Sequence, residues 1–80
     1  MNKNIKKTVF EIFSDVMDIP ISELKLESSP DNIISWDSLS HVKIIMQIEH
    51  QFKINLLPEE ATEIFSIKDA ISIISSKTLK

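Results

Sequence analysis

The sequence has no cysteine, and this absence removes several kinds of chemistry. None of its 80 residues offers a thiol that could form a disulfide, ligate a metal ion or act as a catalytic nucleophile. If the protein takes part in thiol chemistry, a cofactor must bring the sulfur.

Glycine is absent as well. Turns must therefore be made by proline, asparagine, aspartate and serine. Helices often end with a glycine in the left-handed conformation. Because no glycine is present, we expect Lys53, after a predicted helix, to adopt that conformation at some energetic cost.

The chain also lacks a long apolar run and an excess of basic residues. No apolar segment approaches the length of a membrane span. Glu11 and Asp15 interrupt the segment after the basic N-terminus, so we expect no signal peptide. The formal net charge is −3, whereas nucleic-acid binders usually have a basic face. We therefore expect a cytoplasmic protein that neither enters a membrane nor binds nucleic acid.

Length and composition indicate one small globular domain. The apolar fraction is 42% and the charged fraction 26%, which is ordinary for a soluble domain. A chain of this length buries only about 60% of its unfolded surface. We therefore expect residues 1–80 to form a single monomeric domain with a small pocket or a binding surface rather than a large cavity.

Apolar residues recur at helical spacing in four segments. Pro58, followed by two acids, is typical of a helix start, and Ser66 with Asp69 resembles a capping box. We expect helices at about residues 4–17, 38–52, 58–64 and 67–75, followed by a frayed tail at 76–80. The predicted fold class is all-α: a small four-helix bundle with a long first loop and a short third helix.

The segment between the first two helices, residues 18–36, has no sustained period. Long connections inside compact domains are often functional. We expect four apolar side chains to fix this loop to the core: Leu24, Leu26, Ile33 and Ile34.

The second helix has more apolar residues than one buried face needs. One stripe contains Ile44, Ile45, Ile48 and Phe52, and a second stripe beside Ser38 contains Leu39, Val42 and Met46. Together they cover more than about 200° of the helix circumference. Helices in small bundles can be buried on two faces, so the second stripe could be core. It could equally form an exposed apolar patch that marks an interaction site.

Ser38 has three candidate roles. Asp37 or Ser38 could cap the second helix, because both side chains can accept from its first N–H groups. Ser38 could be a nucleophile activated by His41, its neighbour on the helix. Against this, no glycine-flanked nucleophile elbow is present and no third residue orients His41. Ser38 could finally be a point of attachment, because a helix N-terminus favours a phosphate group.

The motif Asp37-Ser38-Leu39, with the apolar spacing that follows it, resembles the acyl carrier protein family. The matching positions continue as Val42, Ile45, Met46, Ile48, Glu49 and Phe52, and then through the segment "INLLPEEATEIFSIKDAISII". The resemblance covers nearly the whole chain and is strongest over residues 33–74.

This resemblance implies that Ser38, within the motif that Asp37 and Leu39 complete, receives 4′-phosphopantetheine from a phosphopantetheinyl transferase. The thiol of the arm would hold an acyl group as a thioester, so the chain would be a carrier and not an enzyme. Its other partners would be enzymes that transfer or condense acyl groups. The resemblance implies a narrow apolar channel between the second and third helices, and recognition through Leu39, Val42, Met46, Glu49, Glu60 and Ile64.

Several residues depart from the family pattern. Carriers of fatty-acid synthesis usually have an acid where Ser40 stands and more acids along the second helix, where Lys43 and Gln47 occur. Trp36 is larger than the usual residue before the motif. Because charge patterns set partner choice, we expect a specialised pathway, such as the assembly of surface polysaccharides or secondary metabolites.

Three alternatives remain open at this point. The chain could be an aminoacyl or peptidyl carrier, or a D-alanyl carrier, since these share the helix order and the modified serine. It could be a helical protein-interaction module without a prosthetic group. A hydrolase that uses Ser38 and His41 is the third.

Overall fold

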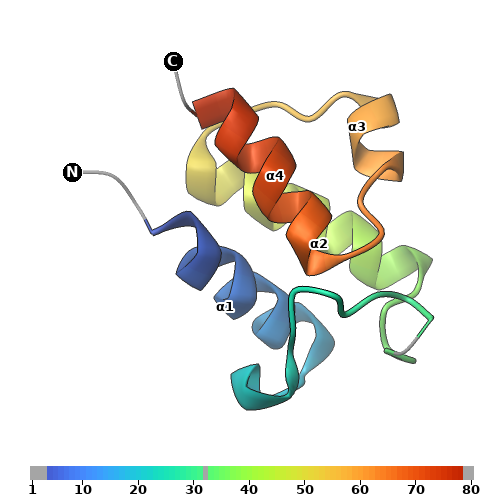
Figure 1. Ribbon diagram of the computed structural model, residues 1–80. Helices are drawn as coiled ribbons and strands as arrows, with labels where there is room; N and C mark the ends of the chain where they lie inside the picture. Colours follow the sequence, from blue (N-terminus) through green and yellow to red (C-terminus); the bar gives the residue numbers. More distant parts are fainter. Residues whose placement is uncertain (1–3, 32, 79–80) are drawn as a thin grey trace.

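The computed structural model describes residues 4–31 and 33–78, which form an all-helical bundle (Figure 1). Four α-helices and a short 3₁₀ helix follow one another, and no strand occurs in this part of the chain. Their bounds are α1 Ile5–Met17, η1 Ile21–Glu23, α2 Ser38–Phe52, α3 Pro58–Thr62 and α4 Ile67–Thr78. The predicted four-helix bundle with a long first loop and a short third helix is confirmed.

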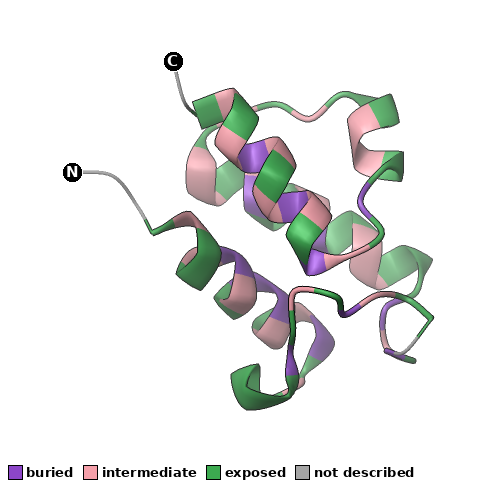
Figure 2. Ribbon diagram, viewed as in Figure 1, coloured by how far each residue is buried: buried purple, intermediate pink, exposed green. Residues whose placement is uncertain are grey.

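The core lies where α1 faces α2 and α4, and each of these helices buries one stripe (Figure 2). The buried side chains are Val9, Ile12 and Phe13 on α1, Ile44 and Ile48 on α2, and Ile67, Ala70 and Ile74 on α4. Burial of one large apolar side chain contributes about 1.5–3 kcal/mol. These stripes therefore provide much of the stability of so small a domain.

Two helices end with a left-handed residue although the chain has no glycine. Asp18 follows α1 with φ 57°, and Lys53 follows α2 with φ 55°. Their backbone N–H groups donate to the carbonyl oxygens of Ser14 and Glu49, which have no partner inside a helix that ends there. The predicted conformation of Lys53 is confirmed.

Side chains cap the starts of α1 and α4. Asn4 Oδ1 accepts from the N–H of Lys7 at 3.0 Å. Ser66 Oγ accepts from the N–H of Asp69, and Asp69 Oδ2 accepts from the N–H of Phe65, both at 3.1 Å. The predicted capping box at Ser66 and Asp69 is present, with its return bond one residue further back than expected.

The loop before α2 places only part of its apolar side chains in the core. Leu24, Ile33 and Trp36 are buried and Leu26 is half-buried, but Ile34 is fully exposed. The expectation that Ile34 fixes the loop is therefore wrong. Consecutive side chains of a non-helical segment point in different directions, and here only Ile33 of the pair faces the core.

The backbone of the same loop is bonded to the start of α4. The N–H groups of Ile67 and Lys68 donate to the carbonyl oxygens of Ser28 and Leu26, at 3.3 and 3.0 Å. The first N–H groups of a helix have no partner inside it, so these bonds satisfy α4 and fix the loop at the same time.

The last two helices differ in length from the prediction. α3 ends at Thr62 and not at 64, because the chain turns there and Ile64 enters the core. α4 continues to Thr78 and not to 75, and Thr78 Oγ1 donates to the carbonyl oxygen of Ile74 at 2.9 Å. The expected frayed tail is therefore helical as far as Thr78. Residues 1–3 and 79–80 of the predicted domain lie outside the described residues.

The described helices are also short in comparison with a membrane span. Among residues 4–31 and 33–78, no helix has the length and apolar character needed to cross a bilayer. The longest, α2, has 15 residues, whereas a spanning helix needs about 20.

The left-handed residue after α2 yields a first prediction. Lys53→Gly should raise the free energy of unfolding by about 0.5–1 kcal/mol, because the strain of about 1–2 kcal/mol that a Cβ causes is removed while unfolded-state entropy offsets part of the gain. Urea denaturation measures the change, and Lys53→Ala, which keeps the Cβ, should give no such gain. A loss of stability in Lys53→Gly would contradict the left-handed conformation.

Candidate functional site

Asp37 caps α2, and Ser38 is the first residue of the helix. Asp37 is in an extended conformation, and its Oδ1 accepts from the N–H of Ser40 at 2.9 Å. That backbone hydrogen bond is the main reason why the pKa of Asp37 lies below its ordinary value of 3.8. Of the three candidate roles for Ser38, capping therefore belongs to its neighbour, and the Ser38 side chain is exposed.

The position of Ser38 suits a phosphate ester. α2 is 15 residues long, and the positive end of its dipole with its first backbone N–H groups favours an anion at this point. An exposed side chain can be modified without disturbing the core. The geometry is therefore compatible with attachment.

A groove of about 570 Å³ opens beside Ser38, between the start of α2 and the end of α3. Its lining is mostly apolar and consists of Pro30, Trp36, Asp37, Ser38, His41, Val42, Thr62, Ile64 and Phe65. The structure differs here from the expected narrow channel between α2 and α3, because the space beside Ser38 is an open groove at the surface. Deeper in the bundle, the side chains of Ile48 and Ile64 are buried and occupy the interior.

His41 forms one wall of this groove, and both of its ring nitrogens are engaged. Trp36 Nε1 donates to His41 Nδ1 at 3.1 Å, and His41 Nε2 lies 2.8 Å from the carbonyl oxygen of Ala61. An indole N–H can only donate, so Nδ1 accepts and the proton sits on Nε2, which donates to Ala61. No ring nitrogen remains to accept a proton from Ser38, which argues against a Ser–His dyad.

The second apolar stripe of α2 is exposed. The exposed fractions are 64% for Leu39, 53% for Val42 and 62% for Met46. Of the two interpretations of this stripe, the structure favours an apolar patch and not a second buried face. Val42 also lines the groove, so the patch is continuous with it.

The acidic residues expected at the partner surface are engaged within the domain. Glu49 Oε2 accepts from the N–H of Leu56 at 2.8 Å. Glu60 Oε1 accepts from the N–H of Leu57 and from Lys77 Nζ, each at 2.9 Å. The two carboxylates therefore hold the segment before α3 and connect α3 to α4.

The prediction that Ile64 belongs to the recognition surface is wrong. Its side chain is only 2% exposed, so it cannot meet a partner in this conformation. The family resemblance implied that Ile64 takes part in recognition, within a third helix expected to reach residue 64, but α3 ends two residues earlier. Phe65, its neighbour, is 66% exposed and lines the groove. Phe65 was missed because it lies between two helices, and no helical period indicates which way it points.

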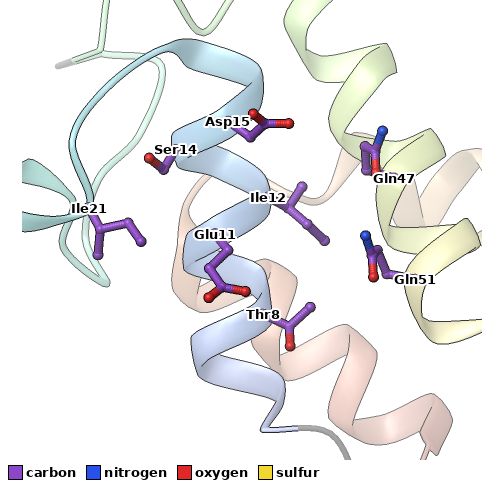
Figure 3. Close-up of a pocket in the computed structure, with 8 residues that line it drawn as sticks. All are labelled: Thr8, Glu11, Ile12, Ser14, Asp15, Ile21, Gln47 and Gln51. Carbon is purple, nitrogen blue, oxygen red and sulfur yellow. The ribbon is translucent and has the colours of Figure 1, made fainter.

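A second depression, of about 420 Å³, lies between α1 and α2 and away from Ser38 (Figure 3). Polar side chains dominate its rim, among them Glu11, Asp15, Gln47 and Gln51. Within residues 4–31 and 33–78, no three histidine or acidic side chains are grouped so that they could hold a metal ion. The groove beside Ser38 is therefore the better candidate for a functional site.

Comparison with solved structures agrees with this fold. The solution structure of the apo doublet acyl carrier protein from prodigiosin biosynthesis is similar, with a TM-score of 0.76 and 30% identity. The match covers 90% of this chain and 35% of that longer protein. No family model matches the chain.

Comparison with curated proteins gives the family. Acyl carrier proteins of Clostridium acetobutylicum, Rickettsia bellii and Buchnera aphidicola are 36%, 34% and 32% identical over 70, 71 and 78 residues. These matches cover 88%, 89% and 98% of this chain and 91%, 83% and 98% of the relatives. The chain belongs to the acyl carrier protein family. Its relatives are carriers rather than enzymes, as the sequence predicted.

The ion pair of α3 yields a prediction on acid stability. The N–H of Leu57, and after it Lys77, lower the pKa of Glu60 below its ordinary value of 4.5. The stabilisation is therefore fully present above pH 4.5 and is lost as the pH falls through the lowered pKa. Glu60→Gln should lower the urea midpoint at pH 7, and the difference from wild type should shrink at pH values below the lowered pKa.

Glu59→Gln is the matched control, because it removes the same charge from an exposed position one residue earlier. It should change the midpoint much less than Glu60→Gln at pH 7. A difference between wild type and Glu60→Gln that stays constant with pH would contradict the role of the Glu60 carboxylate.

Proposed function

We propose that this protein is a discrete acyl carrier protein that holds acyl groups as thioesters on a 4′-phosphopantetheine arm attached to Ser38. The observation behind the proposal is the exposed Ser38 at the start of α2, capped by Asp37 and adjoining a mostly apolar groove. The family membership is consistent with this assignment. A phosphopantetheinyl transferase would install the arm, and a cytoplasmic, monomeric carrier is part of the proposal.

The residues around Ser38 fit such a group. The N-terminus of α2 favours the phosphate, and the groove offers apolar surface to the arm and its cargo. The bound arm would supply the thiol that a chain without cysteine lacks. Asp37 holds the start of α2 through its bond to Ser40, and the motif residue Leu39 exposes an apolar side chain beside the attachment point.

The exposed stripe of Leu39, Val42 and Met46 is the proposed contact surface for enzymes that transfer or condense acyl groups. Phe65 extends this surface, since Phe65 and Val42 both line the groove beside Ser38. Glu49 and Glu60 were expected to contribute to recognition, but their carboxylates already accept hydrogen bonds within the domain. Recognition therefore depends mainly on apolar contact.

A specialised pathway is the finer part of the proposal. Carriers of fatty-acid synthesis usually have an acid where Ser40 stands and more acids along the second helix, where this chain has Lys43 and Gln47, both exposed. The similar doublet protein comes from prodigiosin biosynthesis, which is consistent with such a pathway. Different surface charge selects different partner enzymes.

One observation favours a second candidate, a carrier of aminoacyl or D-alanyl groups. Ile48 of α2 and Ile64, which follows α3, are buried in the core, and the open groove suits short cargo. Incubation of the loaded protein with acyl-transferring and amino-acid-adenylating enzymes would separate the two carriers by the mass of the cargo.

Loading of Ser38 is the central prediction. Coexpression with a broad-specificity phosphopantetheinyl transferase should increase the intact mass by one phosphopantetheine, because the hydroxyl is exposed at a helix start. Ser38→Ala should show no adduct, whereas Ser40→Ala, two residues further along the helix, should be loaded like wild type. An adduct on Ser38→Ala, or none on wild type, would show that the proposal is wrong.

The apolar patch yields a separate prediction. Met46→Glu should leave the helical circular dichroism unchanged, since the side chain is exposed, but should slow loading by the transferase several-fold because a carboxylate replaces apolar contact area. Gln47→Glu introduces the same charge on the polar side of α2 and should have a much smaller effect. If Met46→Glu unfolds the domain, Met46 belongs to the core after all.

A further inference from the structure

α3 has fewer attachments than the other helices. It lies at the edge of the bundle (Figure 1), and none of its five residues is buried. Its link to α4 is the Lys77–Glu60 ion pair, whose side chains are both partly exposed. The position of α3 relative to α2 therefore depends on a small number of interactions.

One of these interactions comes from α2. His41 Nε2 donates to the carbonyl oxygen of Ala61, next to the last residue of α3. Carbonyl groups at a helix C-terminus have no partner inside the helix, and histidine side chains are favourable donors there. His41 thus caps α3 from a neighbouring helix.

Trp36 fixes the tautomer of His41 that can donate to the carbonyl oxygen of Ala61. Neutral imidazole has two tautomers. Because the indole N–H donates to Nδ1, only the tautomer with its proton on Nε2 is compatible with this bond. The indole itself is fixed, because Trp36 is 4% exposed and its ring packs edge-on against Phe13, with 5.1 Å between the ring centroids. Trp36 therefore orients His41 from inside the core.

We propose that this Trp36–His41–Ala61 link holds α3 against α2 and so limits the length of the cargo that the protein can enclose. The inference rests on the proposed function, since it concerns cargo attached at Ser38. While the link is intact, Ile64 occupies the interior and cargo lies in the open groove. A longer acyl chain would have to displace Ile64, which requires α3 to move and the His41–Ala61 bond to break.

The link can be tested first in the protein without an arm, by hydrogen exchange in ¹⁵N-labelled samples. Trp36 is the only tryptophan, so its indole N–H gives one resonance. In His41→Leu the indole N–H and the amide of Ile64, which donates to Ala61, should exchange faster by about tenfold or more. Amides of α1 should not change. His50→Leu, the same substitution at an exposed position of α2, should behave like wild type.

Trp36→Phe provides a second variant if His41→Leu does not fold. It keeps an aromatic ring against Phe13 but removes the donor to His41, and the Ile64 amide should again exchange faster. Unchanged exchange at Ile64 in the folded variants would overturn the proposal.

The effect on cargo is tested with acetyl and octanoyl thioesters on the loaded protein, by their rates of cleavage with hydroxylamine. In wild type the two rates should be similar, because neither cargo is enclosed. In His41→Leu the octanoyl thioester should be cleaved several-fold more slowly than the acetyl thioester. An octanoyl group protected in wild type, or equal rates in the variant, would overturn the proposal. Failure to load Ser38 at all would instead refute the proposed function, and the exchange experiment would still decide whether the link holds α3.

Discussion

The indole of Trp36 connects α1 and α2 directly, and it connects them to α3 through His41. Its ring packs against Phe13 of α1, and its N–H donates to His41 of α2. Through His41 the same chain of bonds reaches Ala61 at the end of α3. A buried N–H without a partner costs about 1–3 kcal/mol, so placing Trp36 in the core requires an acceptor at the place where Nδ1 of His41 lies. Trp36 therefore constrains the rotamer and tautomer of His41. Because His41 lines the groove, Trp36 also fixes the position of this side chain in the groove wall.

α2 has two apolar faces, one in the core and one at the surface. Ile44 and Ile48 are fully buried on one side. Leu39, Val42 and Met46 remain more than half exposed on another. Full burial of side chains of this kind contributes about 1.5–3 kcal/mol each, and the fold does not use that energy. These exposed apolar groups adjoin a groove and an exposed serine, which is why we propose this stripe as a contact surface for partner proteins.

The sequence predicted the features that local signals determine. The bounds of α2, the start of α3 at Pro58 and the left-handed Lys53 depend on caps and neighbours within a few residues, and the structure has all three. Ile64 was assigned to the recognition surface from the family resemblance, within a helix expected to reach residue 64. The chain turns after Thr62 instead, and the Ile64 side chain enters the core. The bond between Trp36 and His41 was not predicted because it crosses the start of α2, where periodicity gives no information.

The engaged carboxylates explain why so few acids on α2 and α3 are left for recognition. Glu49 accepts from the N–H of Leu56, which fixes the segment leading into α3, and Glu60 accepts from its own helix start and from Lys77 of α4. Both acids therefore maintain the position of α3, the same element that His41 caps. With these charges satisfied internally, the exposed cation Lys43 lies beside the apolar stripe of α2. Since charge sets specificity more than affinity, an enzyme that docks at the proposed contact surface would have to offer apolar surface and tolerate, or pair with, that lysine.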